Sequence, residues 1–185
     1  MKKPLKYAQE LVQTVVSAGD VVVDATCGNG HDTVFLAALV GTAGQVYAFD
    51  IQPQALAATK KKLLDSQLQA QVKLWEADHA DIAFWPQAPL AAVMFNLGYL
   101  PGGDHALVTR AETTVRALQI AVARLKEDGV ITLMVYRGHP GGEQEYQALL
   151  NYCQFLPQQN YAVLEYQFIN QQHQPPLLLA ISRLP

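Results

Sequence analysis

The residues Val21-Val22-Val23-Asp24-Ala25-Thr26-Cys27-Gly28-Asn29-Gly30-His31-Asp32-Thr33 decide the fold of this chain. The three valines predict a short buried strand, the two glycines predict a tight turn, and the apolar residues that follow predict a helix. A strand that passes through a Gly-x-Gly turn into a helix is typical of the first crossover of a doubly wound sheet. Because glycines let the backbone approach a ligand and a helix N-terminus offers unpaired N–H groups, we expect a nucleotide-like cofactor at this turn.

Two further positions narrow the kind of cofactor. The dinucleotide fingerprint needs a third glycine at position 33, where this chain has Thr33, which weakens the case for a bound pyrophosphate. Asp50 ends a second apolar run 20 residues (50 − 30) after Gly30, about the distance at which an acidic residue holds a ribose diol. The pattern predicts an adenosine-containing cofactor, either NAD or S-adenosylmethionine. The alternative is an ordinary tight turn without a ligand.

The composition is that of one compact globular domain over residues 1–185. The net charge of −3 argues mildly against a nucleic-acid partner, although a local basic patch is compatible with it. Cys27 and Cys153 form no zinc or Cys-x-x-Cys motif, so we expect free thiols and no metal site. The sequence shows no apolar run typical of a leader or a membrane span, so we expect a cytoplasmic protein without membrane contact.

The hydrophobic periodicity predicts an α/β fold, with a mostly parallel seven-stranded sheet and helices on both faces. Residues 171–176 are too few for a crossover, so the last two strands should form an antiparallel hairpin. Asp32 should cap the second helix, and Pro53 should open the third. The strands are expected at 21–24, 46–50, 72–75, 91–95, 130–136, 161–170 and 177–182, with a leading helix before residue 19, a fourth helix over about 106–126 and a fifth that ends near 153.

Polar residues follow three more of the expected strands. Asp78 and His79 come after the third strand, residues 96–104 after the fourth, and residues 137–145 after the fifth. Because parallel strands end at one edge of a sheet, these segments should surround the cofactor turn. For each of them the alternative is a polar turn without a function, since Asp and Gly are common in turns.

Three long motifs carry a resemblance to a known family. They are the stretch 24–33, the stretch Asn96-Leu97-Gly98-Tyr99-Leu100-Pro101-Gly102-Gly103-Asp104 with Thr109, Thr113 and Thr114 after it, and Tyr136-x-Gly138-His139-x-Gly141-Gly142-x-x-Glu145. Together they resemble the bacterial family long labelled rRNA methylases, within the class I S-adenosylmethionine-dependent methyltransferases. The resemblance covers nearly the whole chain. It implies the Rossmann-like class I methyltransferase fold and S-adenosylmethionine as the cofactor.

The resemblance also implies a reaction and a partner. The reaction is methylation of the aminomethyl group of 5-aminomethyl-2-thiouridine at the tRNA wobble position, which gives the 5-methylaminomethyl form. The partner would then be tRNA, whereas the older label implies rRNA. Within enzymes the alternative is a small-molecule or protein N-methyltransferase, favoured by the acidic net charge. A non-catalytic nucleotide-binding module is a further alternative, and a homodimer is left open.

The resemblance, added to the turn and the second acid, predicts the cofactor contacts. They are Asp24, Thr26, Gly28, Asn29, Gly30, Asp32, Thr33, Asp50, Gln52, Asp78, His79 and Asn96. In this interpretation the glycine turn holds the methionine part, the acid after the second strand holds the ribose, and the acid after the third strand holds the adenine amine.

The predicted catalytic residues are Asn96, Tyr99, Asp104 and His139. The start of the 96–104 segment resembles the Asn-Pro-Pro-Tyr motif of amine methyltransferases, with Leu-Gly in place of Pro-Pro. The resemblance implies that the Asn96 oxygen and the Leu97 carbonyl accept hydrogen bonds from the target nitrogen and that Tyr99 stacks on the base. Because the amine must lose a proton before attack, a nearby acceptor is needed. His139, with Asp104 and His79 as alternatives, is the candidate.

Positive side chains that could contact phosphates are scattered along the chain. The candidates are Arg110, Arg116, Arg137 and the group Lys2, Lys3 and Lys6. For each of them an isolated surface charge is the alternative interpretation.

Overall fold

The computed structural model describes residues 1–102 and 107–185. Their strands form one mixed seven-stranded sheet in the order β3-β2-β1-β4-β5-β7-β6. The strands are β1 (Val21–Asp24), β2 (Gln45–Asp50), β3 (Val72–Glu76), β4 (Leu90–Leu97), β5 (Leu125–Val135), β6 (Tyr161–Tyr166) and β7 (Leu177–Arg183). Strands β1 to β5 are parallel, and β7 runs antiparallel to both β5 and β6. The expected α/β fold with its C-terminal antiparallel hairpin is confirmed.

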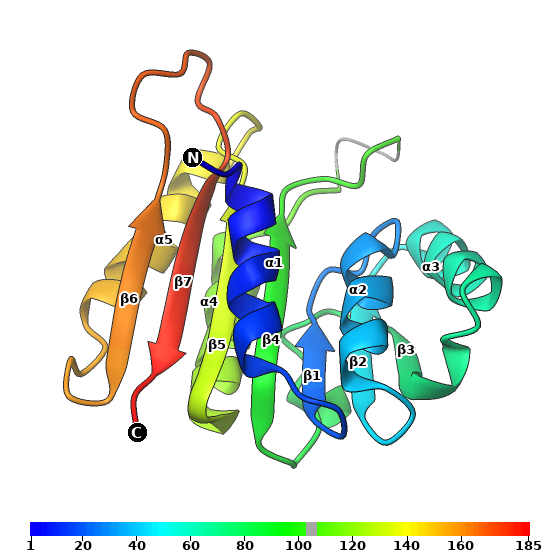
Figure 1. Cartoon of the computed structure of the whole chain (residues 1–185). Coiled ribbons are helices and arrows are strands. Elements are labelled where there is room, and N and C mark those ends of the chain that lie inside the picture. Colours follow the sequence, from blue (N-terminus) through cyan, green and yellow to red (C-terminus); the bar gives the residue numbers. More distant parts are fainter. Residues whose placement is uncertain (103–106) are drawn as a thin grey trace.

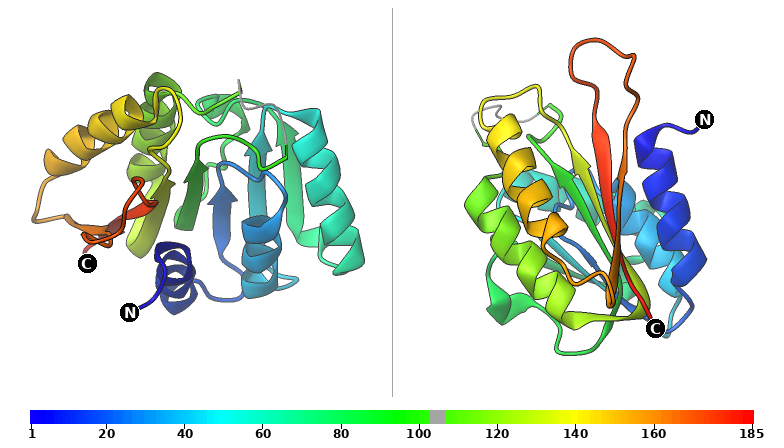
Figure 2. Two further views of the ribbon diagram at one scale, coloured as in Figure 1. Left: turned by 90° about the horizontal axis from the view of Figure 1, so that it is seen from above. Right: turned by 90° about the vertical axis from the view of Figure 1, so that its left-hand side faces the viewer.

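Helices cover both faces of this sheet (Figure 1; Figure 2, right). They are α1 (Pro4–Val15), α2 (His31–Val40), α3 (Pro53–Asp65), α4 (Ala111–Arg124) and α5 (Gly142–Gln154), with short 3-10 turns η1 (Gln69–Gln71) and η2 (Ile82–Phe84). Helices α1 and α2 lie on one face, and α4 and α5 lie on the other (Figure 2). Because strands β1 to β5 are parallel, all five end at one edge of the sheet, which is the upper edge in Figure 1.

The two larger hydrophobic clusters follow from the alternation of side chains along the central strands. Val22 and Met94 belong to the core under α1 and α2, whereas their neighbours Val23 and Phe95 belong to the core under α4 and α5. Successive side chains of a strand point to opposite faces, so a strand covered on both faces needs a continuous apolar run. This is why the central strand β4 is buried from Leu90 through Phe95.

The start of α4 differs from the sequence expectation. The helix begins at Ala111, whereas we expected it near residue 106. Val108 forms an antiparallel bridge with Tyr99, and the Thr109 amide donates to the Gly98 carbonyl at 2.9 Å. These contacts keep the backbone before Arg110 extended, so it cannot join the helix.

Three other boundaries and one helix cap also differ from expectation. Strand β4 continues to Leu97, so Asn96 lies on the strand and not after it. Strand β5 begins at Leu125, earlier than expected, because Leu125 pairs with Leu90 before a register shift in the ladder. Strand β6 ends at Tyr166, where its pairing with Leu178 ends. Asp32 does not cap α2: the N-cap is Gly30 in a left-handed conformation, and no side chain caps the helix. Asp32 instead lies in the first helical turn, where a negative charge is favoured by the helix dipole.

No helix in the described part of the chain is both long and apolar enough to cross a bilayer.

Candidate active site

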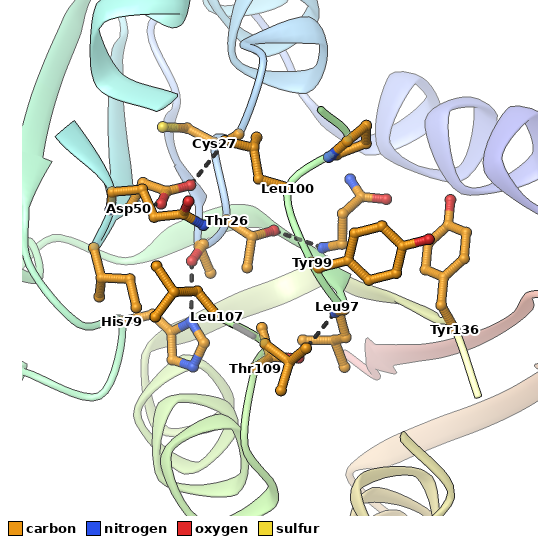
Figure 3. Close-up of a pocket in the computed structure, with 18 of the residues that line it drawn as sticks. Thr26, Cys27, Asp50, His79, Leu97, Tyr99, Leu100, Leu107, Thr109 and Tyr136 are labelled. Atoms are coloured by element: carbon orange, nitrogen blue, oxygen red, sulfur yellow. Dashed lines mark hydrogen bonds between the residues drawn. The ribbon is translucent and has the colours of Figure 1, made fainter. Parts of the chain in front are cut away.

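A cavity of about 790 Å³ opens at the carboxyl edge of the sheet (Figure 3). The loops after β1, β2, β3, β4 and β5 line it, and α1 contributes Leu5 and Gln9 from the side. Figure 3 shows Thr26, Asp50 and His79 on one side of the cavity and Tyr99 and Tyr136 on the other. A cavity of this size suits a small molecule, and its position is the usual ligand site of an open α/β sheet.

The turn after β1 is held in shape by its glycines. Gly28 has a φ of +49°, in the left-handed region that favours glycine. A Cβ on Gly30 would meet the backbone and side chain of Thr59 at 2.8 Å, so α3 packs directly on the turn. The Thr59 hydroxyl donates to the Gly28 carbonyl at 2.9 Å. The first part of the cavity wall is therefore a fixed backbone surface.

Asp50, at the end of β2, joins this turn to the next loop. One carboxylate oxygen accepts from the Gly28 amide at 3.0 Å, and the other accepts from the Gln52 amide at 2.9 Å. Burial raises the pKa of Asp50, and the amide donors oppose that rise. Each carboxylate oxygen has two lone pairs, so Asp50 retains acceptor sites for hydroxyl donors of a ligand in the cavity that it lines.

His79 presents an acceptor nitrogen in the same region. Its Nδ1 lies 3.1 Å from the Ala25 carbonyl, which can only accept, so Nδ1 carries the proton. Nε2 is therefore the lone-pair nitrogen, and it is buried without a partner among the described residues. Burial lowers the pKa of His79, which keeps the ring neutral. Asp78 lies beside it, with one carboxylate oxygen bound to the Ala80 amide at 2.8 Å.

Asn96 is fixed through both its backbone and its side chain. Its backbone amide donates to the Thr26 hydroxyl at 2.6 Å, and its side-chain Nδ2 donates to the Asp32 carboxylate. Because a carboxylate only accepts, the amide nitrogen must face Asp32 and the Oδ1 oxygen must point elsewhere. Asn96 lines the cavity, as predicted.

His139 lies against two glycines after β5. A Cβ on Gly142 would meet its Nε2 at 3.0 Å, and a Cβ on Gly98 would meet the same atom at 3.7 Å. Its Nδ1 faces the Pro140 carbonyl at 3.1 Å, so Nε2 is again the lone-pair nitrogen. That atom is buried and without a partner in the described part of the chain. The edge of the Tyr99 ring faces the imidazole, with ring centres 6.4 Å apart.

Glu145, a buried residue of α5, connects the segments that form the cavity wall after β4. Its side chain is only 1% exposed, and its two oxygens accept from the hydroxyls of Thr109 at 2.7 Å and Thr114 at 2.6 Å. The Thr109 hydroxyl in turn accepts from the Gly98 amide at 2.9 Å. A buried carboxylate therefore connects the loop after β4 to both α4 and α5.

The comparisons with known proteins agree with this geometry. Residues 46–182 match the family model described as "Putative rRNA methylase". The chain belongs to this family. It is also 37% identical, over 98% of its own length and 70% of the relative's, to a protein of Arabidopsis thaliana named tRNA (mnm(5)s(2)U34)-methyltransferase, chloroplastic.

Solved structures of rRNA-methylase-like proteins superpose on the whole chain. One from Clostridium thermocellum has a TM-score of 0.97 and 43% identity, covering 100% of this chain and 99% of the other. A methyltransferase from Streptococcus mutans, solved in complex with SAH, has a TM-score of 0.92 and 38% identity with the same coverage. The protein is an S-adenosylmethionine-dependent methyltransferase.

The side chains of this methyltransferase fit its cofactor. S-adenosylmethionine carries an adenine, a ribose diol and an amino acid, all of which need hydrogen-bond partners. The cavity offers the unpartnered Nε2 of His79 and the spare acceptor sites of Asp50, next to a glycine turn that a ligand can approach closely. No group of three or more His, Cys, Asp or Glu side chains in the described residues could hold a metal ion.

Most of the predicted cofactor residues of the methyltransferase line the cavity. They are Thr26, Gly28, Asn29, Asp32, Asp50, Gln52, Asp78, His79 and Asn96. Asp24, Gly30 and Thr33 do not line it. Asp24 is fully buried and accepts from the Thr26 amide at 3.2 Å and the Thr33 hydroxyl at 2.6 Å, so these residues support the turn from behind.

Three of the four predicted catalytic residues belong to the described part of the chain. Asn96, Tyr99 and His139 all line the cavity. Asp104 lies outside the described residues. Gln9 was missed: its Nε2 donates to Asp32 at 3.0 Å, across 23 residues of sequence. Nothing local in the sequence signals a contact between helices so far apart in the chain.

Both cysteines of the chain are buried and free. Cys27 lines the cavity, and burial, followed by the charges of Asp24 and Asp50, raises the pKa of its thiol. Burial also raises the pKa of Cys153, in α5, to about 12. Neither thiol is activated as a nucleophile.

Proposed function

We propose that this methyltransferase acts on tRNA and methylates the aminomethyl nitrogen of 5-aminomethyl-2-thiouridine at the wobble position. The product would be 5-methylaminomethyl-2-thiouridine. The observation that carries the proposal is the Asn96 amide, held at the cavity with its nitrogen on Asp32, while its oxygen has no hydrogen bond to a described residue and can accept from a donor such as an amine. The 37% identical relative, which is named for a modification of uridine 34 in tRNA, supports this choice of substrate.

In this proposal the first half of the cavity holds the cofactor. Asp50 takes the ribose hydroxyls, because it lies at the end of β2 and has spare acceptor sites. Asp78 and the Nε2 atom of His79 take the adenine edge. The backbone of Gly28 and Asn29 holds the methionine part.

The second half of the cavity holds the amine. When bound, S-adenosylmethionine supplies an electrophilic methyl group on a sulfonium. The lone pair of the substrate nitrogen forms the new C–N bond while the S–CH₃ bond breaks and its electron pair goes to sulfur. Asn96 and the Leu97 carbonyl orient the nitrogen toward the methyl group. The amine proton must pass to an acceptor, and in this proposal the unpartnered Nε2 of His139, which lines the cavity, takes it.

The rim of the cavity offers contacts for RNA. Tyr99 is 42% exposed there and can stack on a base that turns out of the anticodon loop. Arg110 and Arg137 also line the cavity and can contact phosphates. Lys2 is less suitable, because it pairs with Glu10.

The family description favours a second candidate substrate, namely rRNA. A small molecule is the third, favoured by the net charge of −3. The experiment that separates them supplies the enzyme with labelled S-adenosylmethionine and either aminomethyl-containing tRNA, tRNA that lacks this group, or rRNA. Digestion to nucleosides and mass spectrometry then locate the methyl group. We expect label only in the first RNA, at the wobble uridine; label in rRNA alone would contradict the proposal.

The role of Asn96 is tested in the same assay. If Asn96 orients the nitrogen mainly in the transition state, Asn96→Ala should lower the single-turnover rate by roughly 10²-fold or more, with little change in cofactor affinity. Full turnover by Asn96→Ala would show that the loop is only a scaffold.

A further inference from the structure

A chain of hydrogen bonds connects three separate elements to the acceptor side of the cavity. Gln9 of α1 donates through Nε2 to one oxygen of Asp32 at 3.0 Å. Asn96 of β4 donates through Nδ2 to the other oxygen of Asp32, which belongs to α2. Asp32 is only 6% exposed. Both of its oxygens are therefore occupied by protein donors.

Asp32 has no salt-bridge partner in the described part of the chain. It lies in the first turn of α2, where the helix dipole favours an acidic residue. Its charge also raises the pKa of the neighbouring Asp24 to about 7, after the larger effect of burial. Asp24 therefore holds a proton more readily than an ordinary aspartate does.

An ionised carboxylate determines which way the Asn96 amide faces. The two ends of an amide have nearly the same shape, so a half-turn exchanges an acceptor oxygen for a donor NH₂ group. A target amine needs an acceptor, and an Asn96 in the reverse orientation would present hydrogens to it. With Asp32 ionised, the reverse orientation would put the Asn96 oxygen against a carboxylate oxygen, which is repulsive.

We propose that Asp32 is a positioning residue for methyl transfer, which sets the orientation of the Asn96 amide, and that Gln9 holds Asp32 in place. The proposal rests on the proposed function, because it takes Asn96 as the residue that receives the amine. It gives Asp32 a role different from the cofactor contact that the sequence predicts. It also explains why α1 reaches the cavity: the helix packs on β5 and β7 and brings Gln9 to Asp32.

Asp32→Asn is the sharpest variant, because it keeps the shape and removes one acceptor. Gln9 and Asn96 donate to different oxygens of Asp32, so in the variant one of the two donors would face an NH₂ group, and the Asn96 amide is no longer held in one orientation. We expect the single-turnover rate to fall about 10-fold or more, with affinity for S-adenosylmethionine, measured by calorimetry, nearly unchanged. Gln9→Met should also lower the single-turnover rate, by a smaller factor. Gln13→Met, at an exposed position of the same helix, is the matched control and should have no effect.

A double-mutant cycle shows whether Asp32 acts through Asn96. If it does, Asp32→Asn should lower the single-turnover rate little in an Asn96→Ala background, because the residue that Asp32 positions is already lost. An equal loss of rate in both backgrounds would overturn the proposal, since it would show that Asp32 acts independently of Asn96.

A second readout does not depend on activity. The side-chain amide signals of Asn96 and Gln9 can be assigned in ¹⁵N-labelled protein by their loss in Asn96→Ala and Gln9→Met. Asp32→Asn should shift both pairs of signals, because both amides donate to Asp32. Unchanged Asn96 signals would overturn the proposal. If the wild-type enzyme methylates no tRNA amine, the proposed function fails, and these signals still decide whether Asp32 orients Asn96.

Discussion

At the scale of single residues, Asp24 shows that the acid ending the first strand is a support for the turn. It is fully buried, and burial, reinforced by the charge of Asp32, raises its pKa to about 7. The folded protein therefore binds a proton on Asp24 that the unfolded chain has already lost. The contribution of Asp24 to stability is fully present below its ordinary pKa and is lost as pH rises through about 7.

This predicts the behaviour of Asp24→Asn, which stays neutral at every pH. We expect the variant to gain stability relative to wild type by more than about 1 kcal/mol between about pH 5 and about pH 8. Denaturant unfolding at the two pH values measures the difference. A stability difference that does not change with pH would show that Asp24 is not protonated in the folded protein.

Asp50 predicts a different outcome, because its carboxylate serves both the turn and the ligand. In Asp50→Asn one of the amides of Gly28 and Gln52 loses its acceptor, and a ribose hydroxyl would face an NH₂ group. We expect affinity for S-adenosylmethionine to fall by about 1.5–3 kcal/mol, as for a lost hydrogen bond to a charged group. Asp65→Asn, on the exposed end of α3, is the calorimetric control. Equal affinities of the two variants would exclude Asp50 from the ribose site.

At the scale of elements, Glu145 joins the loop after β4 to α4 and α5. The Gly98 amide donates to the Thr109 hydroxyl, and that hydroxyl donates to one oxygen of Glu145. The Thr114 hydroxyl donates to the other oxygen. Thr109→Val keeps the shape of the side chain and breaks both bonds of its hydroxyl. We expect it to lower the free energy of unfolding by about 1–3 kcal/mol, because polar groups are left unpaired in a largely buried site.

The matched control is Thr113→Val, in the first turn of α4. The Thr113 hydroxyl donates only to the exposed Arg110 carbonyl at 3.3 Å, so its loss should change stability by less than about 0.5 kcal/mol. Thr109→Val should also slow methylation more than it weakens cofactor binding, because the disturbed loop directly follows Asn96 and Leu97 at the end of β4. Similar effects of the two variants on unfolding would contradict the proposed joint.

The elements that could be predicted from sequence are those with local signals. Strand, turn and burial are indicated directly by the valines and glycines of 21–30 and by the continuous apolar run of β4, and the short connection 171–176 indicates the antiparallel hairpin. The start of α4 could not be predicted, because Tyr99 and Val108 hold the preceding residues extended through a tertiary contact.

The same distinction holds for the site. The residues that follow strands were found, because the edge of a parallel sheet gathers them. Asp32 was found as a residue but expected to cap its helix, because its true partners lie on α1 and β4. Gln9 lies on a helix that shows only an amphipathic pattern, and nothing in that pattern points to the cavity.

At the scale of the whole molecule, the net charge of −3 and an RNA substrate require a local concentration of positive charge. If Arg110 and Arg137 contact phosphates at the rim, affinity for tRNA should fall steeply with added salt, because fewer counterions are released. Arg110→Ala should reduce the slope of log affinity against log salt by about 1. Lys73→Ala, on β3 away from the cavity lining, should leave the slope unchanged. Binding that does not respond to salt would point to a small substrate.

The burial of both thiols makes the molecule well suited to site-specific labelling. A maleimide dye reacts with exposed thiolates, and Cys27 and Cys153 are neither exposed nor readily ionised. A cysteine introduced by Glu112→Cys, at an exposed position near the rim, would then be the one that takes the dye without any native cysteine being removed. Energy transfer from that dye to a labelled anticodon stem could follow docking of the RNA in real time, separately from the chemical step.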